Sequence, residues 1–308
     1  MKRIQVKLMC CAFMSSLIMF SACGESEEPT QNKNPEQGVD TVVNDTEIEP
    51  EFQSFDPSLE YTVPTPSDLF LALQNIGSEG KFNFLNDPAK ISDYGDKKSR
   101  ALNFGVYFAD LSYASSFNYG PDLLNYIKVV DDLSDELNIR SAMDEALKDR
   151  IQAHIAAGTV DSIVSISSDT YYKAYEYLDE NERGGTLRMI VAGGWIEGLY
   201  LLTHMVDAYD SNNPIVEEIA NQQLTVENIM GFLNAYAETD ADVEEVMAEL
   251  SGIEELYMSL EYAEGTTEST VNEDGMTVLD GGERPIISEE QFNELKSMVS
   301  ELRNSITG

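Results

Sequence analysis

Hydrophobic residues recur at spacings of three and four over most of the chain, which is the spacing of one face of an α-helix. Capping or proline residues stand where several of these segments begin, as at Ser67, Pro121, Ser141 and Pro214. The pattern predicts helices over 67–77, 97–118, 121–137, 141–158, 161–166, 167–183, 186–210, 214–223, 225–238, 241–264 and 288–306. We therefore expect an all-α fold, a bundle or array of roughly ten helices.

Some segments also indicate how the helices are arranged. The segment 186–210 is the most apolar beyond the N-terminal region, so it is expected at the centre. The segments 241–264 and 288–306 each carry one continuous apolar seam, which favours an antiparallel pair. The insertion between them is either a short β-hairpin turning at Asp274-Gly275 or a mobile loop, and we favour the hairpin.

Two helical segments resemble each other. When "ALNFGVYFADLSY" is laid over "MIVAGGWIEGLYL", the matched pairs are Gly105 with Gly193, Tyr107 with Trp195, and Leu111 with Leu199. A helix opened by proline follows each segment. Two related halves packed together explain this similarity, and a chance resemblance is the alternative.

The N-terminus has the pattern of a secretory signal, which we assign to residues 1–22. Basic residues precede an apolar stretch from Leu8 to Phe20, and Ser21-Ala22-Cys23 ends it. The stretch is short for a membrane span, although an uncleaved anchor helix is the alternative. The string Phe20-Ser21-Ala22-Cys23 resembles the lipobox of bacterial lipoproteins. This resemblance implies that Cys23 is lipidated and becomes the mature N-terminus.

The remainder divides into residues 23–55, an acidic flexible tether, and residues 56–308, the helical domain. The tether is polar and interrupted by three prolines, so it buries too little apolar surface to fold alone. Cys10 and Cys11 leave with the signal, and Cys23 is used by lipid. The mature chain then has no thiol for a disulfide, a thiolate metal site or a nucleophile.

The charge balance narrows the possible partners. The 308 residues include 56 acidic and 19 basic ones, a net charge of −37. Phosphate backbones require a basic surface, so nucleic acid is excluded as a partner. An anionic membrane surface also repels such a domain, so we expect membrane contact through the lipid anchor only. The acidic surface favours solubility, and binding of cations or a basic partner is the alternative.

Motifs of established chemistry are missing from the sequence. It contains no HExxH, no GxxxxGK[ST], no GxSxG and no GxGxxG, and we expect no cofactor. The segment from Asp240 begins like a calcium-binding loop, but Glu245 and Ser251 stand where that loop requires glycine and glutamate. We interpret it as a helix N-terminus, where acidic residues are favourable.

The best candidate site is a cluster of acidic and imidazole side chains. Glu197, His204 and Asp207 are seven and three residues apart on the expected central helix, and Asp110 lies on the helix that resembles it. Such a cluster is able to bind a divalent metal or to perform acid–base chemistry. We favour the structural explanation, in which acids inside an apolar helix are paired with Arg or Tyr, and Arg100 and Arg188 are available as partners.

Two further features have structural explanations that we favour. His154, the other histidine, lies near a helix end and is expected to interact with the helix dipole. The pair Gly193-Gly194 lowers the helix propensity of this segment. Close approach of another helix is the usual compensation, and Gly198, one turn further on, fits such a contact. A ligand groove at these glycines, lined by Trp195 and Tyr200, is the alternative.

Several strings resemble those of a group of predicted lipoproteins from Bacteroidota-type bacteria, namely "RALNFGVYFADLSYA", "DELNI", "AYEYLDENER" and "IVAGGWIEGLYL". The resemblance covers nearly the whole mature chain and implies a helical protein without an established activity. Glu25, Glu27 and Glu28 are similar to the acidic signal that exports such lipoproteins to the cell surface. This implies an outer-membrane lipoprotein on the surface, with the periplasmic face as the alternative.

The expected function is that of a non-enzymatic binding lipoprotein, which holds an unidentified protein or small-molecule partner in a groove between helices. One alternative is a metal-binding protein or hydrolase-type enzyme that uses the Glu/His/Asp cluster. A structural component of the envelope is the other.

Overall fold

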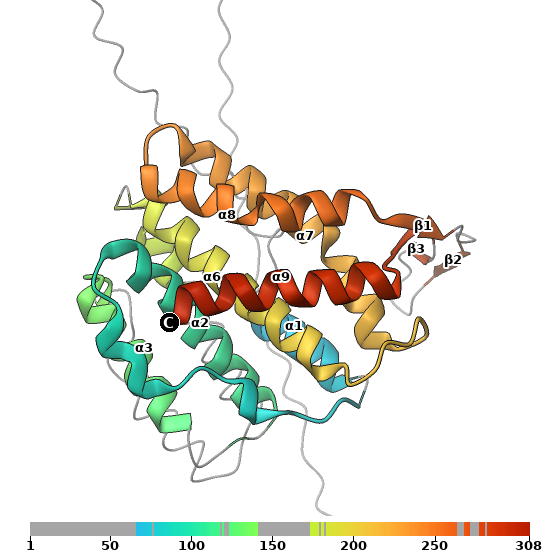
Figure 1. Cartoon of the computed structure of the whole chain (residues 1–308), viewed down its shortest axis with the longest axis horizontal. Coiled ribbons are helices and arrows are strands. Elements are labelled where there is room, and N and C mark those ends of the chain that lie inside the picture. The colour runs from blue at the N-terminus through green and yellow to red at the C-terminus, as the bar shows by residue number, and fades with distance from the viewer. Residues whose placement is uncertain are drawn as a thin grey trace, which may run out of the picture. The chain divides into compact units, whose positions relative to one another are not determined.

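A computed structural model describes residues 66–75, 77–117, 119, 123–140, 173–178, 180–181, 183–263, 268–271, 277–280 and 282–308. These residues are mostly helical (Figure 1), which confirms the all-α class. Several predictions lie outside the described residues: the signal over 1–22, the tether over 23–55, Cys23, His154, and the helices over 141–158 and 161–166.

The helices begin and end close to their predicted limits. They are α1 (Pro66–Asn75), α2 (Lys97–Ser116), α3 (Leu123–Glu136), α6 (Gly184–Met205), α7 (Pro214–Ala237), α8 (Ala241–Met258) and α9 (Glu289–Thr307). Capping boxes start α2 and α9, where Asp96 pairs with Ser99 and Ser288 with Gln291. Asp240 accepts from the N–H of Asp242, so the acidic segment there is a helix N-terminus, as predicted.

Helices α2 and α6 cross in backbone contact at the centre of the fold. A Cβ atom on Gly105 would lie 2.1 Å from the carbonyl oxygen of Ile190. A Cβ atom on Gly193 would lie 2.1 Å from the carbonyl oxygen of Leu102. Both distances are far shorter than a carbon–oxygen contact, so only glycine fits at either position. The predicted close packing at Gly193 is confirmed, and its partner is the matched segment.

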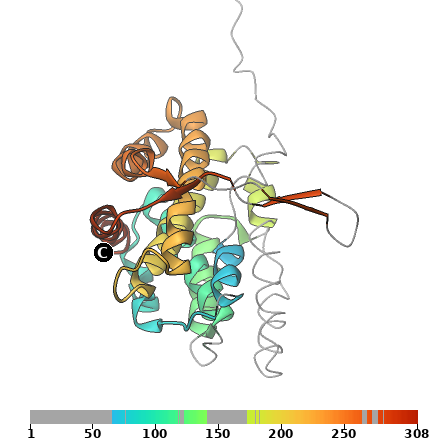
Figure 2. The same cartoon turned by 90° about the vertical axis from the view of Figure 1, so that its right-hand side faces the viewer.

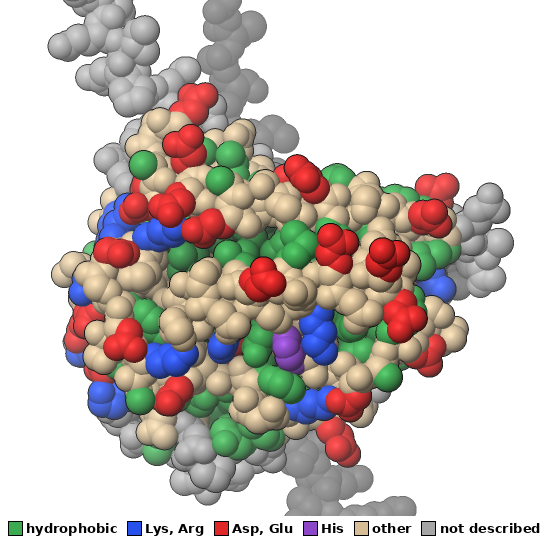
Figure 3. All heavy atoms as spheres, viewed as in Figure 1, with side chains coloured by type: hydrophobic (Ala, Val, Ile, Leu, Met, Phe, Trp, Pro, Cys, Tyr) green, Lys and Arg blue, Asp and Glu red, His purple; other side chains and the backbone are tan. Residues whose placement is uncertain are grey.

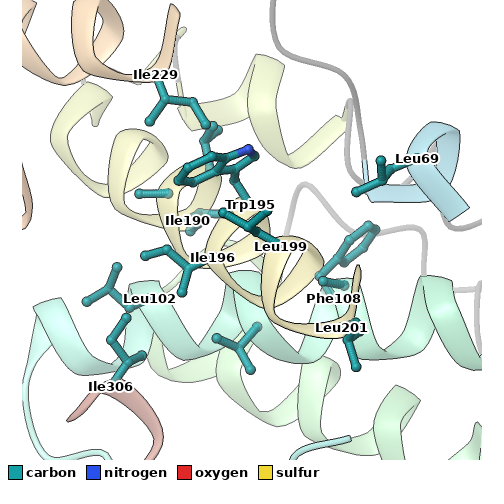
Figure 4. Packing of buried hydrophobic residues seen from close by; sticks show 14 of the residues in the cluster. Leu69, Leu102, Phe108, Ile190, Trp195, Ile196, Leu199, Leu201, Ile229 and Ile306 are labelled. Carbon is teal, nitrogen blue, oxygen red and sulfur yellow. The ribbon is translucent and has the colours of Figure 1, made fainter. Parts of the chain in front are cut away.

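Helix α6 is buried nearly all round, as expected for a central helix. Figure 4 shows Trp195 reaching towards Ile229 of α7, while Ile196 points towards Leu102 of α2. Helix α1 covers another side, where a Cβ atom on Gly198 would lie 3.2 Å from Leu69. These contacts join α1, α2 and α7 to α6 in one hydrophobic core.

Helices α8 and α9 run antiparallel, as their apolar seams predict (Figure 1). The side chain of Gln291, in the first turn of α9, donates to the carbonyl oxygen of Ser259, which follows the last turn of α8 (3.4 Å). Further along, a Cβ atom on Gly252 would lie 2.9 Å from the Met298 side chain. The same helix α9 also packs along α6, which brings the C-terminal residues to the core.

A two-stranded ribbon connects α8 to α9 and leads away from the helices (Figure 2). Its strands are β1 (Glu261–Ala263), β2 (Glu268–Val271), β3 (Thr277–Asp280) and β4 (Arg284–Ile286). Strand β1 pairs antiparallel with β4, and β2 with β3. The strands of the predicted hairpin are thereby confirmed, and its turn at Asp274-Gly275 lies outside the described residues.

Some helix limits differ from the prediction. Helix α6 ends at Met205 because Val206 is extended (φ −84°, ψ 110°), five residues before the predicted end at 210. The segments 214–223 and 225–238 form the single helix α7, since nothing at Leu224 interrupts the backbone. The predicted helix over 241–264 ends at Met258, where the chain turns into β1. No helix in the described part of the chain is both long enough and apolar enough to span a membrane.

Candidate functional site

The α2–α6 crossing brings two acidic side chains into the core. Asp110 lies on α2 and Glu197 on α6, each beyond the glycine contact in its own helix. Both are fully buried. Helix α9 packs across α6 and adds Arg303, which is also buried. These three residues, Asp110, Glu197 and Arg303, form what we term the acid–arginine cluster.

Arg303 binds Glu197 through two parallel hydrogen bonds. Its Nε donates to Oε2 of Glu197 at 2.9 Å, and its Nη2 donates to Oε1 at 3.2 Å. This bidentate geometry suits a guanidinium and a carboxylate. Nη2 also donates to the carbonyl oxygen of Phe84, and Nη1 donates to the hydroxyl of Thr307, each at 3.4 Å. Burial opposes the charge on Arg303, but the Glu197 carboxylate offsets this effect and the pKa of Arg303 is raised.

Asp110 has the more strongly raised pKa of the two acids in the cluster. Burial, followed by the negative charge of Glu197, raises the pKa of Asp110 well above its ordinary range. One carboxyl oxygen, Oδ2, accepts from the backbone N–H of Asn86 at 3.0 Å. The other, Oδ1, is buried and has no hydrogen-bond partner among the described residues. Burial raises the pKa of Glu197, and the charge and hydrogen bonds of Arg303 partly offset this effect.

A loop and two helices close the cluster from solvent through a tyrosine network. Tyr126 of α3 donates to the carbonyl oxygen of Asn86 (3.1 Å), and the Asn86 side-chain amide donates to Tyr94 (3.1 Å). The hydroxyls of Tyr94 and Tyr107 are 3.2 Å apart, and Tyr107 donates to the carbonyl oxygen of Asp87 (2.7 Å). These bonds hold the loop that contains the short 3₁₀ helices η2 (Phe82–Phe84) and η3 (Pro88–Asp93) over the cluster.

Only two of the four predicted cluster residues come together. Asp110 and Glu197 meet, but Asp207 is exposed and forms an ion pair with Lys81 at 2.6 Å. The physical reason is the end of α6 at Met205, because beyond it Asp207 no longer follows the helical stripe from Glu197. In the described part of the chain, no group of three or more His, Cys, Asp or Glu side chains is arranged to hold a metal ion.

His204 is half-buried and separate from the two acids. Its Nδ1 lies 2.7 Å from the carbonyl oxygen of Tyr200, so Nδ1 carries a hydrogen. Burial lowers the pKa of His204, and the nearby charges of Lys296, Arg303 and Lys81 lower it further. Figure 3 shows this histidine in purple among basic side chains. A neutral ring that packs against Phe84 and Tyr200 explains the arrangement.

At the α6 glycines, where a ligand groove was the predicted alternative, the described residues are closely packed. Gly193 and Gly194 face α2, and Trp195 is buried with its indole N–H donating to Gln222 at 3.3 Å. Tyr200 is half-buried, with the guanidinium of Arg303 4.7 Å from its ring centroid. Packed helices therefore occupy the space that a ligand would need.

Sequence reasoning identified the need for an arginine partner but not the correct residue. Arg100 binds Glu136 and the carbonyl oxygen of Tyr94 instead. Arg188 donates to the carbonyl oxygen of Phe232 and packs against aromatic rings. Arg303 follows Leu302, which belongs to the apolar seam of α9, and this proximity is the only signal in the sequence.

No family model, no curated protein and no solved structure matches the chain. The function must therefore be argued from its own residues. The acid–arginine cluster is chemically distinctive, but it is closed to substrate by α3, α9 and the loop before α2. Within the cluster, the paired hydrogen bonds between Arg303 and Glu197 join α9 to α6.

Proposed function

We propose that the protein is a lipid-anchored envelope protein whose helical domain binds a partner without catalysing a reaction. The single observation that carries the proposal is the string Phe20-Ser21-Ala22-Cys23 after a basic and apolar leader. The lipid on Cys23 attaches the chain to the outer membrane. The acidic tether then holds the domain away from the headgroups, and Glu25, Glu27 and Glu28 direct it to the cell surface.

Burial of the acid–arginine cluster supports a non-enzymatic role. Catalytic acids need access to a substrate, whereas Asp110 and Glu197 have no exposed surface. Glu197 instead binds Arg303 and so joins α6 to α9, while Asp110 binds the loop before α2 through the N–H of Asn86. The resemblance to predicted lipoproteins without an established activity agrees with this role.

We further propose that the domain contains roughly ten helices in two related halves, one built on α2 and one on α6. The reciprocal contact at the crossing supports this. Gly105 faces Ile190, and Gly193 faces Leu102. The sequence offset that aligns Gly105 with Gly193 also aligns Leu102 with Ile190. Such self-complementary contacts are what a local two-fold axis produces.

The anchor is tested by growing cells with a fatty acid that carries an alkyne tag. The tag is expected on the wild-type chain and lost in Cys23→Ala. Cys10→Ala is the matched control, because that cysteine leaves with the signal and labelling should persist. An unlabelled wild-type chain, or labelling that survives Cys23→Ala, would contradict lipidation at this residue.

Location is tested by adding protease to intact cells. Surface display predicts digestion of the wild-type chain while a periplasmic marker stays whole. Full protection of the chain, with digestion only after the outer membrane is opened, would place it on the periplasmic face.

A further inference from the structure

Exposed apolar side chains are concentrated around the base of the ribbon. The large hydrophobic residues that are exposed in the described part of the chain are Leu124, Leu224, Met258, Tyr262 and Ile286. All but Leu124 lie on α7, at the end of α8, or on β1 and β4. The most exposed are Leu224 at 65% and Tyr262 at 51%. A soluble acidic domain gains nothing from such a concentration unless it is covered in use.

Tyr262 of the ribbon is tied to the part of α7 that carries Leu224. The hydroxyl of Tyr262 donates to the side-chain oxygen of Gln223 at 2.8 Å, and Gln223 precedes Leu224 on α7. Arg284 of β4 binds Glu217 of α7, which fixes the base of the ribbon against the same helix. We term Leu224 and Tyr262, both exposed at the junction of α7 and the ribbon, the ribbon-base patch.

The pairing of β1 with β4 leaves hydrogen-bonding groups free beside this patch. Tyr262 lies opposite Pro285 in the ladder. Proline has no N–H, so this pair does not exchange the two hydrogen bonds of a bonded antiparallel pair. The hydrogen bonds between the two strands are instead assigned to the adjacent pairs, Glu261 with Ile286 and Ala263 with Arg284. The N–H and C=O of Tyr262 consequently point outward from β1, away from β4.

The two edges of this short sheet are not equivalent. Strand β4 packs against α7 and carries Pro285, a residue that discourages strand addition at an edge. Strand β1 has no proline, and no described strand lies on its outer side. An extended chain is therefore able to pair with β1, with the N–H and C=O of Tyr262 as its hydrogen-bonding partners.

The surrounding charge specifies what kind of segment fits. Exposed acidic residues lie on the elements that meet at the patch: Glu227 on α7, Glu255 on α8, Glu261 on β1 and Glu283 directly before β4. Between residues 189 and 295 the chain has a single basic residue, Arg284, and it is already bound to Glu217. Figure 3 shows acidic side chains around the end of this face where the ribbon begins. A second copy would bring acid against acid, whereas a basic segment is complementary.

We propose that the outer edge of β1 and the ribbon-base patch form a docking site for an extended segment of a partner protein in which basic and apolar residues alternate. The segment adds as a strand beside β1. The apolar side chains of the partner segment cover Leu224 and Tyr262. Its basic side chains interact with the exposed acidic residues of α7, α8 and the ribbon. This inference rests on the proposed binding function and names the class of partner.

The test uses the full chain and a short fluorescent peptide of alternating lysine and valine with blocked ends, followed by anisotropy. The wild-type chain is expected to bind this peptide saturably, and less tightly as salt is raised. Peptides of alternating glutamate and valine are expected not to bind. The same is expected of the lysine–valine peptide with proline at its centre, because it cannot form a continuous strand.

Variants then locate the binding. Leu224→Ser removes the apolar contact, and Tyr262→Pro removes the outward N–H without removing a bond of the β1–β4 ladder. Each is expected to weaken binding roughly tenfold or more. Leu124→Ser is the matched control, because Leu124 is also exposed (41%) but lies on α3, and its affinity should equal that of the wild-type chain.

The docking site is contradicted if the proline-interrupted peptide binds as well as the intact one. It is equally contradicted if Leu224→Ser and Tyr262→Pro bind like the wild-type chain while their helical circular dichroism is unchanged, or if the intact peptide does not bind. These outcomes leave the proposed anchoring intact, because lipid labelling at Cys23 is measured independently of any peptide.

Discussion

Gly105 and Gly193 meet at the crossing of α2 and α6, each facing a backbone carbonyl of the other helix. Because the obstacle is backbone on both sides, no side chain can move to relieve the overlap. The crossing also sets the positions of Asp110 and Glu197 further along the same helices. A pair of glycines thus determines both the central packing and the geometry of the buried acids.

Alanine at either glycine is expected to destabilise the fold. Gly105→Ala and Gly193→Ala each force the helices apart, and we expect a loss of about 3 kcal/mol in the free energy of unfolding despite alanine's better helix propensity. Gly231→Ala on α7 is the control, because a Cβ atom there meets nothing within 4 Å. That variant should gain about 0.5 kcal/mol. Urea unfolding followed by circular dichroism measures all three, and equal stability of the three variants would refute backbone contact.

Removal of Arg303 is expected to leave a buried carboxylate without its cation. Arg303→Met keeps much of the side-chain volume but removes both hydrogen bonds to Glu197, so the free energy of unfolding should fall by about 3–5 kcal/mol. Arg284→Met is the matched control, because its ion pair with Glu217 is exposed and is worth about 1 kcal/mol or less. Similar losses in both variants would show that Arg303 does not neutralise the cluster.

Much of the fold could be predicted because its signals are local. Periodic apolar positions located α2 and α9 nearly to the residue, and the low helix propensity of Gly193 indicated a close helix contact. The end of α6 was missed because Val206 and Asp207 carry no strong stop signal. That error of five residues placed Asp207 on a helical stripe that does not continue so far.

The site was only half predictable because its partners are distant in the sequence. Asp110 and Glu197 come from matched segments, so their meeting could be inferred from the internal similarity. Arg303 lies on the last helix, and only the packing of α9 along α6 brings it to Glu197. The direction of the Tyr262 backbone likewise depends on its pairing with Pro285, which the periodicity of the chain does not reveal.

The lowered pKa of His204 predicts a neutral ring at neutral pH and a loss of stability in acid. The unfolded chain takes up a proton near the ordinary histidine pKa, whereas the folded chain takes it up at lower pH. The contribution of His204 to stability is therefore complete above the ordinary histidine pKa, and it is lost as the pH is lowered through that value. His204→Gln should remove this part of the acid-side loss. Nuclear magnetic resonance of the ring protons gives the pKa directly, and a value above the ordinary one would contradict the predicted burial effect.

The raised pKa of Asp110 predicts the opposite dependence. Its folded-state pKa is raised above that of the unfolded chain, so between the two values the folded state binds more protons. Stability is complete below the ordinary carboxyl pKa of about 4 and falls as the pH rises towards the raised value. Asp110→Asn keeps an acceptor for the Asn86 N–H, places an N–H₂ donor towards Glu197, and has no proton to lose. This variant should match or exceed wild-type stability at neutral and alkaline pH, with a flatter alkaline side.

Asp207→Asn is the matched control for that measurement, because the pKa of Asp207 is shifted in the opposite direction from that of Asp110. The hydrogen bond and the charge of Lys81 lower the pKa of Asp207, so this residue contributes stability above its ordinary pKa and loses it as the pH falls. Replacement of Asp207 should therefore leave unchanged the loss of stability that accompanies rising pH. Thermal unfolding across a pH series distinguishes the cases: an alkaline decline as steep in Asp110→Asn as in the wild-type chain would show that Asp110 is ionised in the folded protein. The acid–arginine cluster would then carry an unneutralised negative charge, which its complete burial makes untenable without a further cation.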